Sequence, residues 1–438
     1  MKPVSKNENF PVVIGIDWAD QKHDICLWDA ANQTLEFDVI KHRPEVLHDW
    51  MCKLRDRFPG KSIAVGLEQS KGALAYLLMQ YEFITIFFVH PATVANTREA
   101  WAPSGAKDDP TDARLIMEMV RGSNYKLKAW HSDSPETRRL MLLTQQRRKL
   151  VDLRVKLTNE LRSCLKSYYP LACEVAGDKL NEKLALDFLS RWPTFEQLKR
   201  SRLTAVRKFY THGNSRYSKA IEKRLEAIEH AEPVTTDEVI VESFSMHMLA
   251  LVAQLRQLRD SIHEYDRKII RTYASHEDTA IISSFPATGK VFGPRLIAAL
   301  GTDRDRFGSA QEIENYTGIA PVTERSGKAH WVHRRWKCSN FIRQSFHEWA
   351  GETRKHSIWA RAFYIQAREK GMGHHQAVRA LAYKWIRILY RCWKERVPYD
   401  ELHYISVLKR RGSGLIKVMY EHPDAIRLNG PIESQFLR

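Results

Sequence analysis

Short apolar runs that alternate with helical patterns, up to about residue 120, constrain the fold of this chain more than any other feature. Val12–Ile16 is apolar and rich in β-branched residues, Ile25–Trp28 follows a polar turn, and Thr34–Ile40 alternates apolar with polar side chains. Three consecutive strands joined by short turns predict an antiparallel meander.

The rest of this part of the chain alternates between helix and strand. A helical pattern begins at Pro44, Ile63–Leu67 resembles a buried strand, and Leu74–Met79 is helical. Ile84–Val89 is a further apolar strand, and a last helix starts near Pro110, a residue that suits the first turn of a helix. This order predicts an α/β domain with a mixed sheet over residues 10–125.

The middle of the chain, residues 134–275, is predicted to be helical. Thr137–Lys166 combines a leucine stripe with an excess of basic residues, which predicts a long basic helix. Residues 170–235 predict short helices joined by polar turns. Apolar residues of Asp237–Tyr273 recur in alternating steps of four and three, the period of a coiled-coil seam. Its partner is either a second chain, in a coiled coil or bundle, or the basic helix of the same chain.

A third, mainly helical domain is predicted over residues 280–400. Residues 281–301 combine a short helix, a turn from Pro286 to Gly289 and a second helix, which is similar to a helix-hairpin-helix whose amides can meet a phosphate. Ala287 stands where such hairpins often have glycine. Residues 401–438 have little apolar pattern, and we leave them as a tail without a predicted order.

The charge of the chain favours a polyanionic partner. Lys and Arg number 69 against 52 Asp and Glu, and this net charge of +17 makes nucleic acid the first candidate and an acidic membrane the second. We expect no membrane, because we find no run of about 18 apolar residues and no signal peptide ahead of Val12. A hydrophobic content of 43% excludes wholesale disorder, and six separated cysteines without a CxxC pair fit a reducing cytoplasm.

The positive charge is concentrated in the long basic helix and in residues 328–343, where tryptophans are interleaved with basic residues. Such stretches can hold a nucleic-acid backbone, and the alternative is a charged face that only meets solvent. The residues that we expect to contact nucleic acid are Arg138, Arg139, Arg147, Arg148, Lys149, Lys328, Arg334, Arg335 and Lys337.

Four acids lie where strands end or a helix begins. Asp17 directly follows the first strand, Glu68 follows the strand Ile63–Leu67, and Asp109 and Asp112 span the start of a helix. Charge at the end of a buried strand is costly unless it faces a ligand or a partner. Four carboxylates at one place remain ionised mainly beside a divalent metal, and oxygen ligands suit Mg²⁺ or Mn²⁺.

Each acid alone also has a simpler interpretation, as a turn residue or a helix cap. The joint pattern is more specific, because these are the metal-facing positions of a ribonuclease-H-like fold. Asp20, Asp24 and Asp108 are nearby alternatives that we rank lower. Asp20 and Asp24 fall in the predicted turn between the first two strands, and Asp108 precedes the helix.

Ser326 is a second candidate for chemistry. It stands in a Ser-Gly step with Arg325 and Lys328 beside it, so its hydroxyl lies where a phosphate would be attracted. A turn serine in a nucleic-acid-binding loop is the alternative. Ser339 and Ser345 lie in the same basic neighbourhood and stay open on residue chemistry.

The first domain resembles the amino-terminal DEDD, RuvC-like domain of Piv/MooV-like insertion-sequence transposases, in the segments GIDWADQKHD, GLEQSKGALA, HPATVANTREAW and KDDPTDARLI. These proteins form insertion-sequence family one hundred and ten and are described as bridge-RNA-guided recombinases. The segment that begins at SSFPATGK and ends at IAPVTERSGKA resembles the carboxy-terminal transposase domain of that family. The resemblance covers roughly residues 12–125 and 280–395, with a helical segment between them as in the family.

The resemblance implies that Asp17, Glu68, Asp109 and Asp112 bind the metal and that Ser326 is the catalytic serine. In the family, this serine attacks a DNA phosphodiester with the help of Mg²⁺ on the acidic domain of a neighbouring protomer. The resemblance also implies a dimer or tetramer, a structured guide RNA that pairs with donor and target DNA, and a bacterial or archaeal, nucleoid-associated protein. Asp108 departs from the family, which commonly has Ser or Thr there.

Two other functions compete with a guided serine recombinase. A RuvC-like nuclease would cut with metal-activated water, and Ser326 would then only bind phosphate. A catalytically silent nucleic-acid-binding protein would share the fold, but a binding role alone has no need for clustered acids near DNA.

Overall fold

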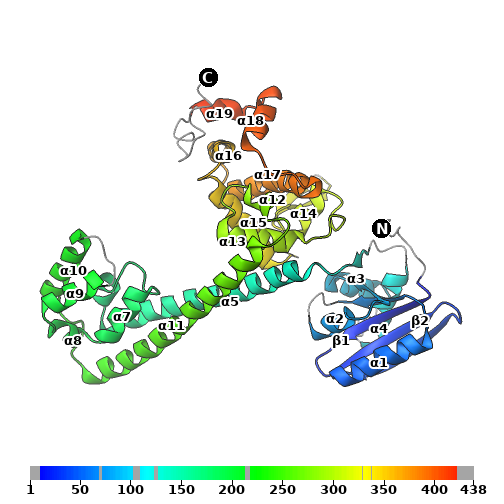
Figure 1. The fold of residues 1–438 in the computed structure, drawn as a ribbon, viewed down its shortest axis with the longest axis horizontal. Helices are drawn as coiled ribbons and strands as arrows, with labels where there is room; N and C mark the ends of the chain where they lie inside the picture. The colour runs from blue at the N-terminus through cyan, green and yellow to red at the C-terminus, as the bar shows by residue number, and fades with distance from the viewer. Residues whose placement is uncertain are drawn as a thin grey trace. The chain divides into compact units, whose positions relative to one another are not determined.

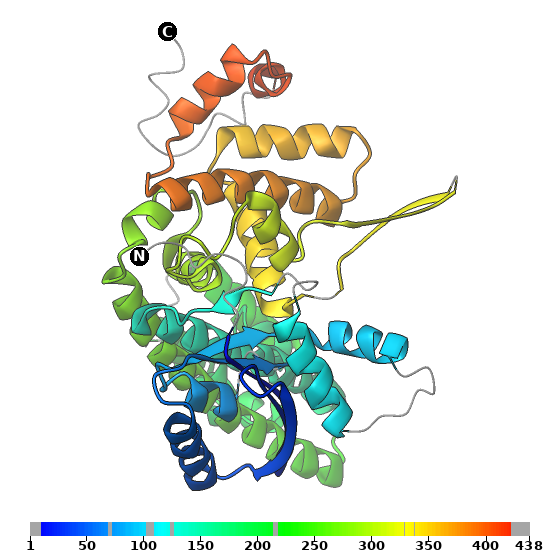
Figure 2. The ribbon, with the colours of Figure 1, turned by 90° about the vertical axis from the view of Figure 1, so that its right-hand side faces the viewer.

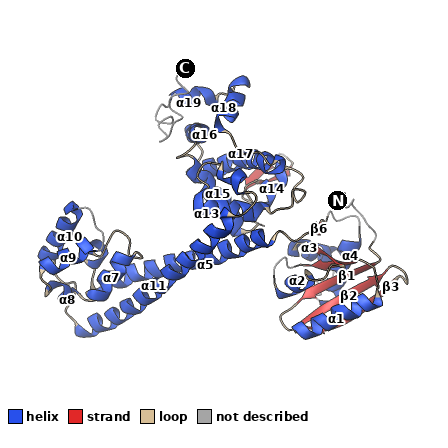
Figure 3. Cartoon of the chain, in the orientation of Figure 1, coloured by secondary structure: helices blue, strands red, loops and turns tan. Residues whose placement is uncertain are grey.

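A computed structural model describes residues 10–68, 72–101, 109–122, 127–212, 218–327, 329–336 and 338–421 (Figures 1 and 3). The chain forms two compact units, Met1–Ser132 and Asp133–Arg438. The first unit holds the six-stranded sheet, and the second is largely helical with one two-stranded ribbon.

The elements of the first unit are β1 (Val12–Trp18), β2 (Lys22–Asp29), β3 (Thr34–Lys41), α1 (Pro44–Arg57), β4 (Ile63–Leu67), α2 (Ala73–Leu78), β5 (Ile84–Phe88), α3 (Pro91–Trp101), α4 (Asp109–Arg121) and β6 (Ala129–Trp130). The strands form one sheet in the order β3-β2-β1-β4-β5-β6. β1, β2 and β3 are antiparallel neighbours, β1, β4 and β5 are parallel, and β6 is antiparallel to β5. The predicted meander and mixed sheet are therefore present, whereas the sequence did not predict α3 and β6.

One face of this sheet holds the larger apolar cluster. Ile14 and Ile16 of β1 and Val65 of β4 pack there with Leu47 and Met51 of α1. These side chains alternate along their strands with residues of the other face, as the period of two requires. The order of apolar residues in each strand thus decides which face α1 covers.

The other face carries glycines where α4 crosses it. A Cβ atom on Gly15 of β1 would lie 2.1 Å from the backbone oxygen of Ala113 in α4, and one on Gly66 of β4 would lie 2.6 Å from Cγ2 of Ile116. The missing side chains let α4 lie directly on the central strands. This close approach fixes where the first turn of α4 stands relative to β1 and β4.

The elements of the second unit are α5 (Pro135–Tyr168), α6 (Ala172–Val175), α7 (Lys183–Arg191), α8 (Phe195–Lys199), α9 (Leu203–His212), α10 (Ser218–His230), α11 (Glu238–Ala274), α12 (Thr279–Ser283), α13 (Gly289–Leu300), α14 (Ala310–Tyr316), β7 (Val322–Ser326), β8 (Ala329–His333), α15 (Asn340–Thr353), α16 (Ile358–Glu369), α17 (His374–Glu395), α18 (Glu401–Arg410) and α19 (Leu415–Glu421). The two long helices and the short helices between them are those that the sequence predicted.

α5 and α11 form a long antiparallel pair, which Figure 1 shows as two ribbons side by side. The Sγ atom of Cys164 near the end of α5 lies 3.5 Å from the backbone oxygen of Phe244 near the start of α11. At the opposite end, Leu140 and Ile269 belong to one cluster. The predicted seam of α11 therefore packs against the basic helix of the same chain, which is the intramolecular alternative.

Two separate cores lie at the two ends of this pair. Leu161 of α5 and Leu255 of α11 pack with the short helices α6–α10 in one cluster. Leu140 and Ile269 pack with α12–α19 in the other. The seam of α11 is thus divided between two cores.

α11 is the one described helix that is long and apolar enough to cross a membrane, judged by length and composition. Of its apolar residues, Met248 and Leu251 are buried against neighbours in the second unit, whereas Val239 and Met246 are exposed. Buried helices of proteins that lie in water can have the same length and composition, so α11 is only weak evidence for a membrane span.

The turn between α12 and α13 places an alanine in a backbone conformation that normally favours glycine. Ala287 has φ of 59°, in the left-handed region that favours glycine, and Gly289 has φ of 40°. The indole nitrogen of Trp349 donates to the backbone oxygen of Pro286 at 3.0 Å and holds the turn against α15. A short helix, a tight turn and a second helix are present as predicted.

Residues 401–421, for which the sequence predicts no order, contain α18 and α19. Ile405, Leu408 and Leu415 are buried in the cluster of the C-terminal helices. The short helices hide their apolar residues among polar ones, so the stripe was too brief to recognise. Residues 422–438 lie outside the described part of the chain.

Candidate active site

Three acids project from the α4 side of the sheet at one end of its central strands. The register places Asp17 of β1 opposite Asp24 of β2. The parallel register pairs Ile16 with Leu67, so Glu68, the next residue after β4, stands level with Asp17. Strand order and register therefore bring together residues that are far apart in the sequence.

The position of Asp24 corrects the predicted turn. β2 begins at Lys22, so Asp24 lies inside a strand and is only 4% exposed. Its carboxylate is 3.8 Å from Nζ of Lys22. Asp20 does lie in the turn and is exposed, whereas Asp108 lies outside the described residues.

α4 contributes the other predicted acids. Asp112, in the first turn, is buried, and its neighbour Ala113 contacts the backbone of β1 at Gly15. Asp109 is the first residue of α4, and its side chain lies outside the described part of the chain. The structure thus gathers Asp17, Glu68 and Asp112 near one edge of the sheet.

A cation that the sequence did not single out lies among these acids. The guanidinium of Arg98, on α3, donates from Nε to Oδ1 of Asp112 at 2.6 Å and from Nη2 to Oδ2. The bond to Asp112 raises the pKa of Arg98, and the charges of Glu68 and Asp17 raise it further. All three carboxylates are therefore close enough to Arg98 to stabilise its charge.

The donor set fits a hard divalent cation by its chemistry, since carboxylate oxygens are the ligands that Mg²⁺ and Mn²⁺ prefer. The guanidinium of Arg98 already lies among these carboxylates and balances part of their negative charge, so the acids form a site that favours a cation. In the described residues, no three Asp, Glu, His or Cys side chains are yet arranged to hold one metal ion. A metal would have to draw the acids together.

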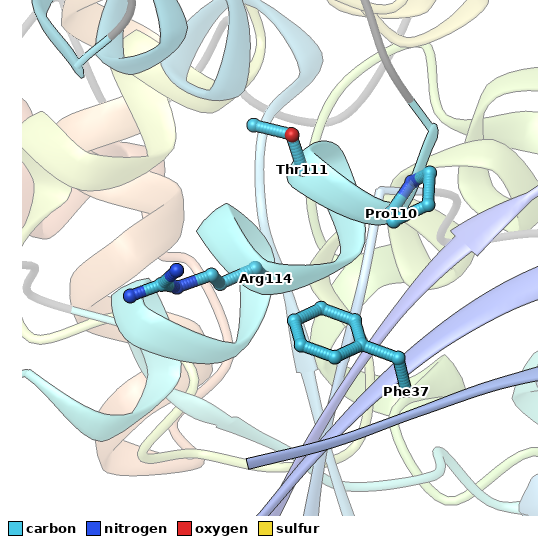
Figure 4. A pocket seen from close by; sticks show the side chains of 4 residues that line it. All are labelled: Phe37, Pro110, Thr111 and Arg114. Atoms are coloured by element: carbon cyan, nitrogen blue, oxygen red, sulfur yellow. The ribbon is translucent and has the colours of Figure 1, made fainter.

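A shallow depression of about 240 Å³ lies beside the first turn of α4 (Figure 4). It is lined by Phe37 of β3 and by Pro110, Thr111 and Arg114 of α4. An aromatic ring and a guanidinium are groups that stack on bases and hold phosphates. The depression is open, with polar and apolar groups in its lining, so it suits the surface of a large ligand better than a buried small molecule.

Ser326 lies in the second unit, at the end of β7, and is exposed. Gly327, which follows it, has φ of 55° and so permits the tight turn into β8. Of the alternative serines, Ser345 is buried and donates to the backbone oxygen of Phe341 at 2.8 Å, and Ser339 caps α15 through the amide of Ile342. Among the three, Ser326 has the hydroxyl best placed to meet an external phosphate.

The basic residues of α5 divide into two groups. Arg138, Arg139 and Lys149 are exposed. Arg147 pairs with Asp266 of α11, and Arg148 pairs with Asp152 at 2.9 Å and with Glu348 of α15 at 3.5 Å. These two guanidinium groups hold helices together and have less charge to offer a nucleic acid.

The basic residues after β8 are also partly engaged. Arg335 donates to Oδ1 of Asn315 at 3.1 Å, and the guanidinium of Arg334 lies 4.9 Å from the ring centre of Trp336. Lys328 and Lys337 lie outside the described residues. Arg334 remains exposed, on a segment that continues the β7–β8 ribbon.

Two family models match the chain. One is a transposase model of the DEDD type for IS110, which matches residues 14–170. The other is the model of the IS116/IS110/IS902 transposase family, which matches residues 279–365. Together they cover more than half of the chain, and each contains one of the two candidate centres.

Curated relatives match along almost the whole chain. The proposed transposase of the IS117 mini-circle from Streptomyces coelicolor is 28% identical over 90% of this chain and 96% of its own length. A 44.8 kDa protein of insertion element IS116 from Streptomyces clavuligerus is 28% identical over 87% of this chain and 94% of its own. A 42 kDa protein of insertion element IS900 from Mycobacterium paratuberculosis is 23% identical over 89% and 97%.

Proposed function

The chain belongs to the IS110/IS116 family of insertion-sequence transposases, and we propose that it exchanges DNA strands by serine attack on phosphorus at a metal-assisted site. Transposases act on DNA, and the net charge of +17 suits that partner. The observation that carries the proposal is the group of acids around Arg98, because clustered carboxylates beside DNA have a purpose only if a cation joins them.

The acids of the first unit would hold Mg²⁺ or Mn²⁺. Asp17 and Glu68 stand level on neighbouring strands, and Asp112 is held beside them by Arg98, with Asp109 at the start of the same helix. When bound, the metal would neutralise a phosphoryl oxygen and so lower the barrier to attack on phosphorus. Asp24, opposite Asp17, adds a further carboxylate to this edge.

Ser326 would supply the nucleophile. Its hydroxyl would lose a proton, its oxygen would bond to phosphorus, and one ester oxygen of the DNA would leave as a hydroxyl. Attack of a different DNA hydroxyl on the phosphoserine would reverse these steps, join new strands and restore Ser326. Each step breaks one phosphorus–oxygen ester bond and forms another, so no outside energy source is needed.

The finer features of the proposal come from the family resemblance. They are a homo-oligomer, dimer or tetramer, in which the acids of one protomer serve the serine of another, and a structured guide RNA that selects donor and target. Exposed Arg138, Arg139 and Lys149 on α5 would hold the backbone of RNA or DNA. Its DNA substrate would place the protein in the cytoplasm, at the nucleoid.

The decisive experiment is a covalent-adduct assay with the full-length protein and the DNA junction of its own element. We expect a denaturation-resistant protein–DNA adduct in Mg²⁺, and none with Ser326→Ala. Ser345→Ala is the matched control, because that hydroxyl is buried in the same domain, and it should keep the adduct. Cutting by Ser326→Ala with free DNA ends would favour a water-using RuvC-like nuclease instead.

A further inference from the structure

The β7–β8 ribbon and the segment that follows it expose two large aromatic side chains. The ribbon is a sheet of two strands, and Figure 2 shows it as a yellow hairpin that stands away from the helices. Trp331 of β8 is 57% exposed, and Trp336, three positions beyond the end of β8, is 71% exposed. Exposed indoles of this size on or just beyond a hairpin that adds nothing to a core indicate an interaction surface.

The register of the ribbon decides which side chains share a face. Ser326 pairs with Ala329, and Glu324 pairs with Trp331. Since directly opposed residues and every second residue share a face, Ser326, Glu324 and Trp331 project to one side. His333 projects there too, and its Nε2 lies 2.8 Å from the carboxylate of Glu324, as this arrangement requires.

The other face of the ribbon carries a different set. Val332 and Thr323 form one pair, and Arg325 and His330 form the next. Val332 is 58% exposed, almost the same as Trp331. The ribbon therefore presents one face with the candidate nucleophile and an indole, and a second face with an aliphatic side chain.

We propose that Trp331 is a stacking platform for an unpaired base of the nucleotide whose phosphate meets Ser326. This inference rests on the proposed function of Ser326 and names the form of the substrate at that site. The two residues are diagonal neighbours, with Cα atoms about 7–8 Å apart in such a ribbon, a spacing that one nucleotide spans between its phosphate and its base. The base must be unpaired, because a base inside a duplex hides both its faces.

The charges of the ribbon favour nucleic acid as its occupant. Arg334 is exposed just beyond β8, and Arg325 is exposed on the face of the ribbon opposite Ser326 and Trp331. Glu324 is the acidic residue of the described ribbon, and His333 is its hydrogen-bond partner, which raises the pKa of His333. The guanidinium of Arg334 over Trp336 makes a second flat, cationic surface of the kind that bases stack on.

The test compares two exposed residues on opposite faces. Trp331→Ala, Trp331→Phe and Val332→Ala are made in the full-length protein, and binding of a fluorescein-labelled oligo-dT strand is measured by anisotropy beside a fully paired duplex. We expect Trp331→Ala to bind the single strand about 10-fold more weakly, because stacking of one base is worth that much. Trp331→Phe keeps most of the affinity, and Val332→Ala stays within about 2-fold of the unchanged protein on the same grounds.

Photocrosslinking tests the position directly. A strand that contains 5-iodouracil should crosslink to Trp331, identified by mass spectrometry, and not to the opposite face. Equal binding by Trp331→Ala, or an equal loss on the duplex, overturns the platform. A change of oligomeric state in Trp331→Ala also overturns it, because the indole would then be covered by a second copy. The adduct assay of Ser326→Ala fails or succeeds separately, so loss of the nucleophile and loss of the platform are distinguishable.

Discussion

Arg98 of α3 donates two hydrogen bonds, from Nε and from Nη2, to the buried carboxylate of Asp112 in α4. The side chain of Asp112 is 3% exposed and that of Arg98 is 21% exposed, so the pair is largely withdrawn from water. Fourteen residues separate them in sequence, and the pair ties the start of α4 to α3. Without another cation present, Arg98 is the positive charge that makes burial of Asp112 tolerable.

Replacing Arg98 by Ala should therefore destabilise the protein when metal is absent. Removing one partner of a buried pair leaves the other charge without compensation, at a cost of about 3 kcal/mol. Unfolding would be followed by circular dichroism in EDTA and in MnCl₂. We expect a larger stabilisation by Mn²⁺ in Arg98→Ala than in the unchanged protein, since the metal then has no competitor at Asp112. Lys53→Ala, which breaks an exposed pair with Asp49, is the control and should respond to Mn²⁺ like the unchanged protein.

Gly15→Ala should damage the acid group without removing a carboxylate. Its Cβ would meet the backbone of Ala113 and of Met117 at 2.1 and 2.4 Å, and backbone atoms cannot move aside without α4. Overpacking of this kind costs about 1–3 kcal/mol and would shift Asp112 away from Asp17. Isothermal titration with Mn²⁺ should show weaker binding. Gly351→Ala, whose Cβ meets an ordinary contact at 3.7 Å, should leave Mn²⁺ binding unchanged; equal effects would contradict the role of α4.

Acid should weaken the first unit through His23. Burial, and then the nearby His42, lowers the pKa of His23 to about 4 from its ordinary 6.5. Between these values the unfolded chain binds more protons than the folded one, so stability is complete above pH 6.5 and is lost as pH falls toward 4. The loss amounts to about 3 kcal/mol at most.

The check is denaturant unfolding between pH 4 and 7. His23→Gln should flatten the pH dependence over this range, because its amide can still meet His42 but cannot gain a proton. His212→Gln, an exposed histidine at the end of α9, should keep the original slope. An unchanged slope in His23→Gln would contradict the assignment.

Exposed and paired arginines of α5 should behave differently toward nucleic acid. Arg139→Ala should reduce the dependence of log K on log salt concentration by about one unit, the effect of losing one phosphate contact. Arg147→Ala should instead lower the melting temperature with little change in that slope, because its guanidinium is committed to Asp266. Binding titrations at several salt concentrations separate the two, and identical slopes in both variants would contradict the distinction.

The sheet was predictable because its buried strands are marked by local runs of apolar residues. β4 occupies the predicted Ile63–Leu67, since five consecutive apolar residues leave no room for another boundary. α3 was missed because its polar stretch Asn96–Glu99 gives no apolar stripe. Missing α3 also meant missing Arg98, whose partner is specified by the packing of two helices and not by spacing.

The acid group was predictable in part for the same reason. Asp17 and Glu68 follow apolar strands, and that signal is local. Asp24 was assigned to a turn because the strand around it begins with polar residues, Lys22 and His23. The alternation of side chains along the strand could have identified it. Asp24 lies two residues before Cys26, so both side chains project to the face that α4 covers.

The antiparallel pair of α5 and α11 makes the region between them a detachable module. The chain leaves α5 at Tyr168, builds its own core from α6–α10, and returns to α11 at Glu238, close to where it left. The C-terminal core, by contrast, includes Leu140, which lies before this detour. Relatives could exchange the detour for one of another size while keeping the same C-terminal core, but a fragment that starts after α11 would lack part of its own interior.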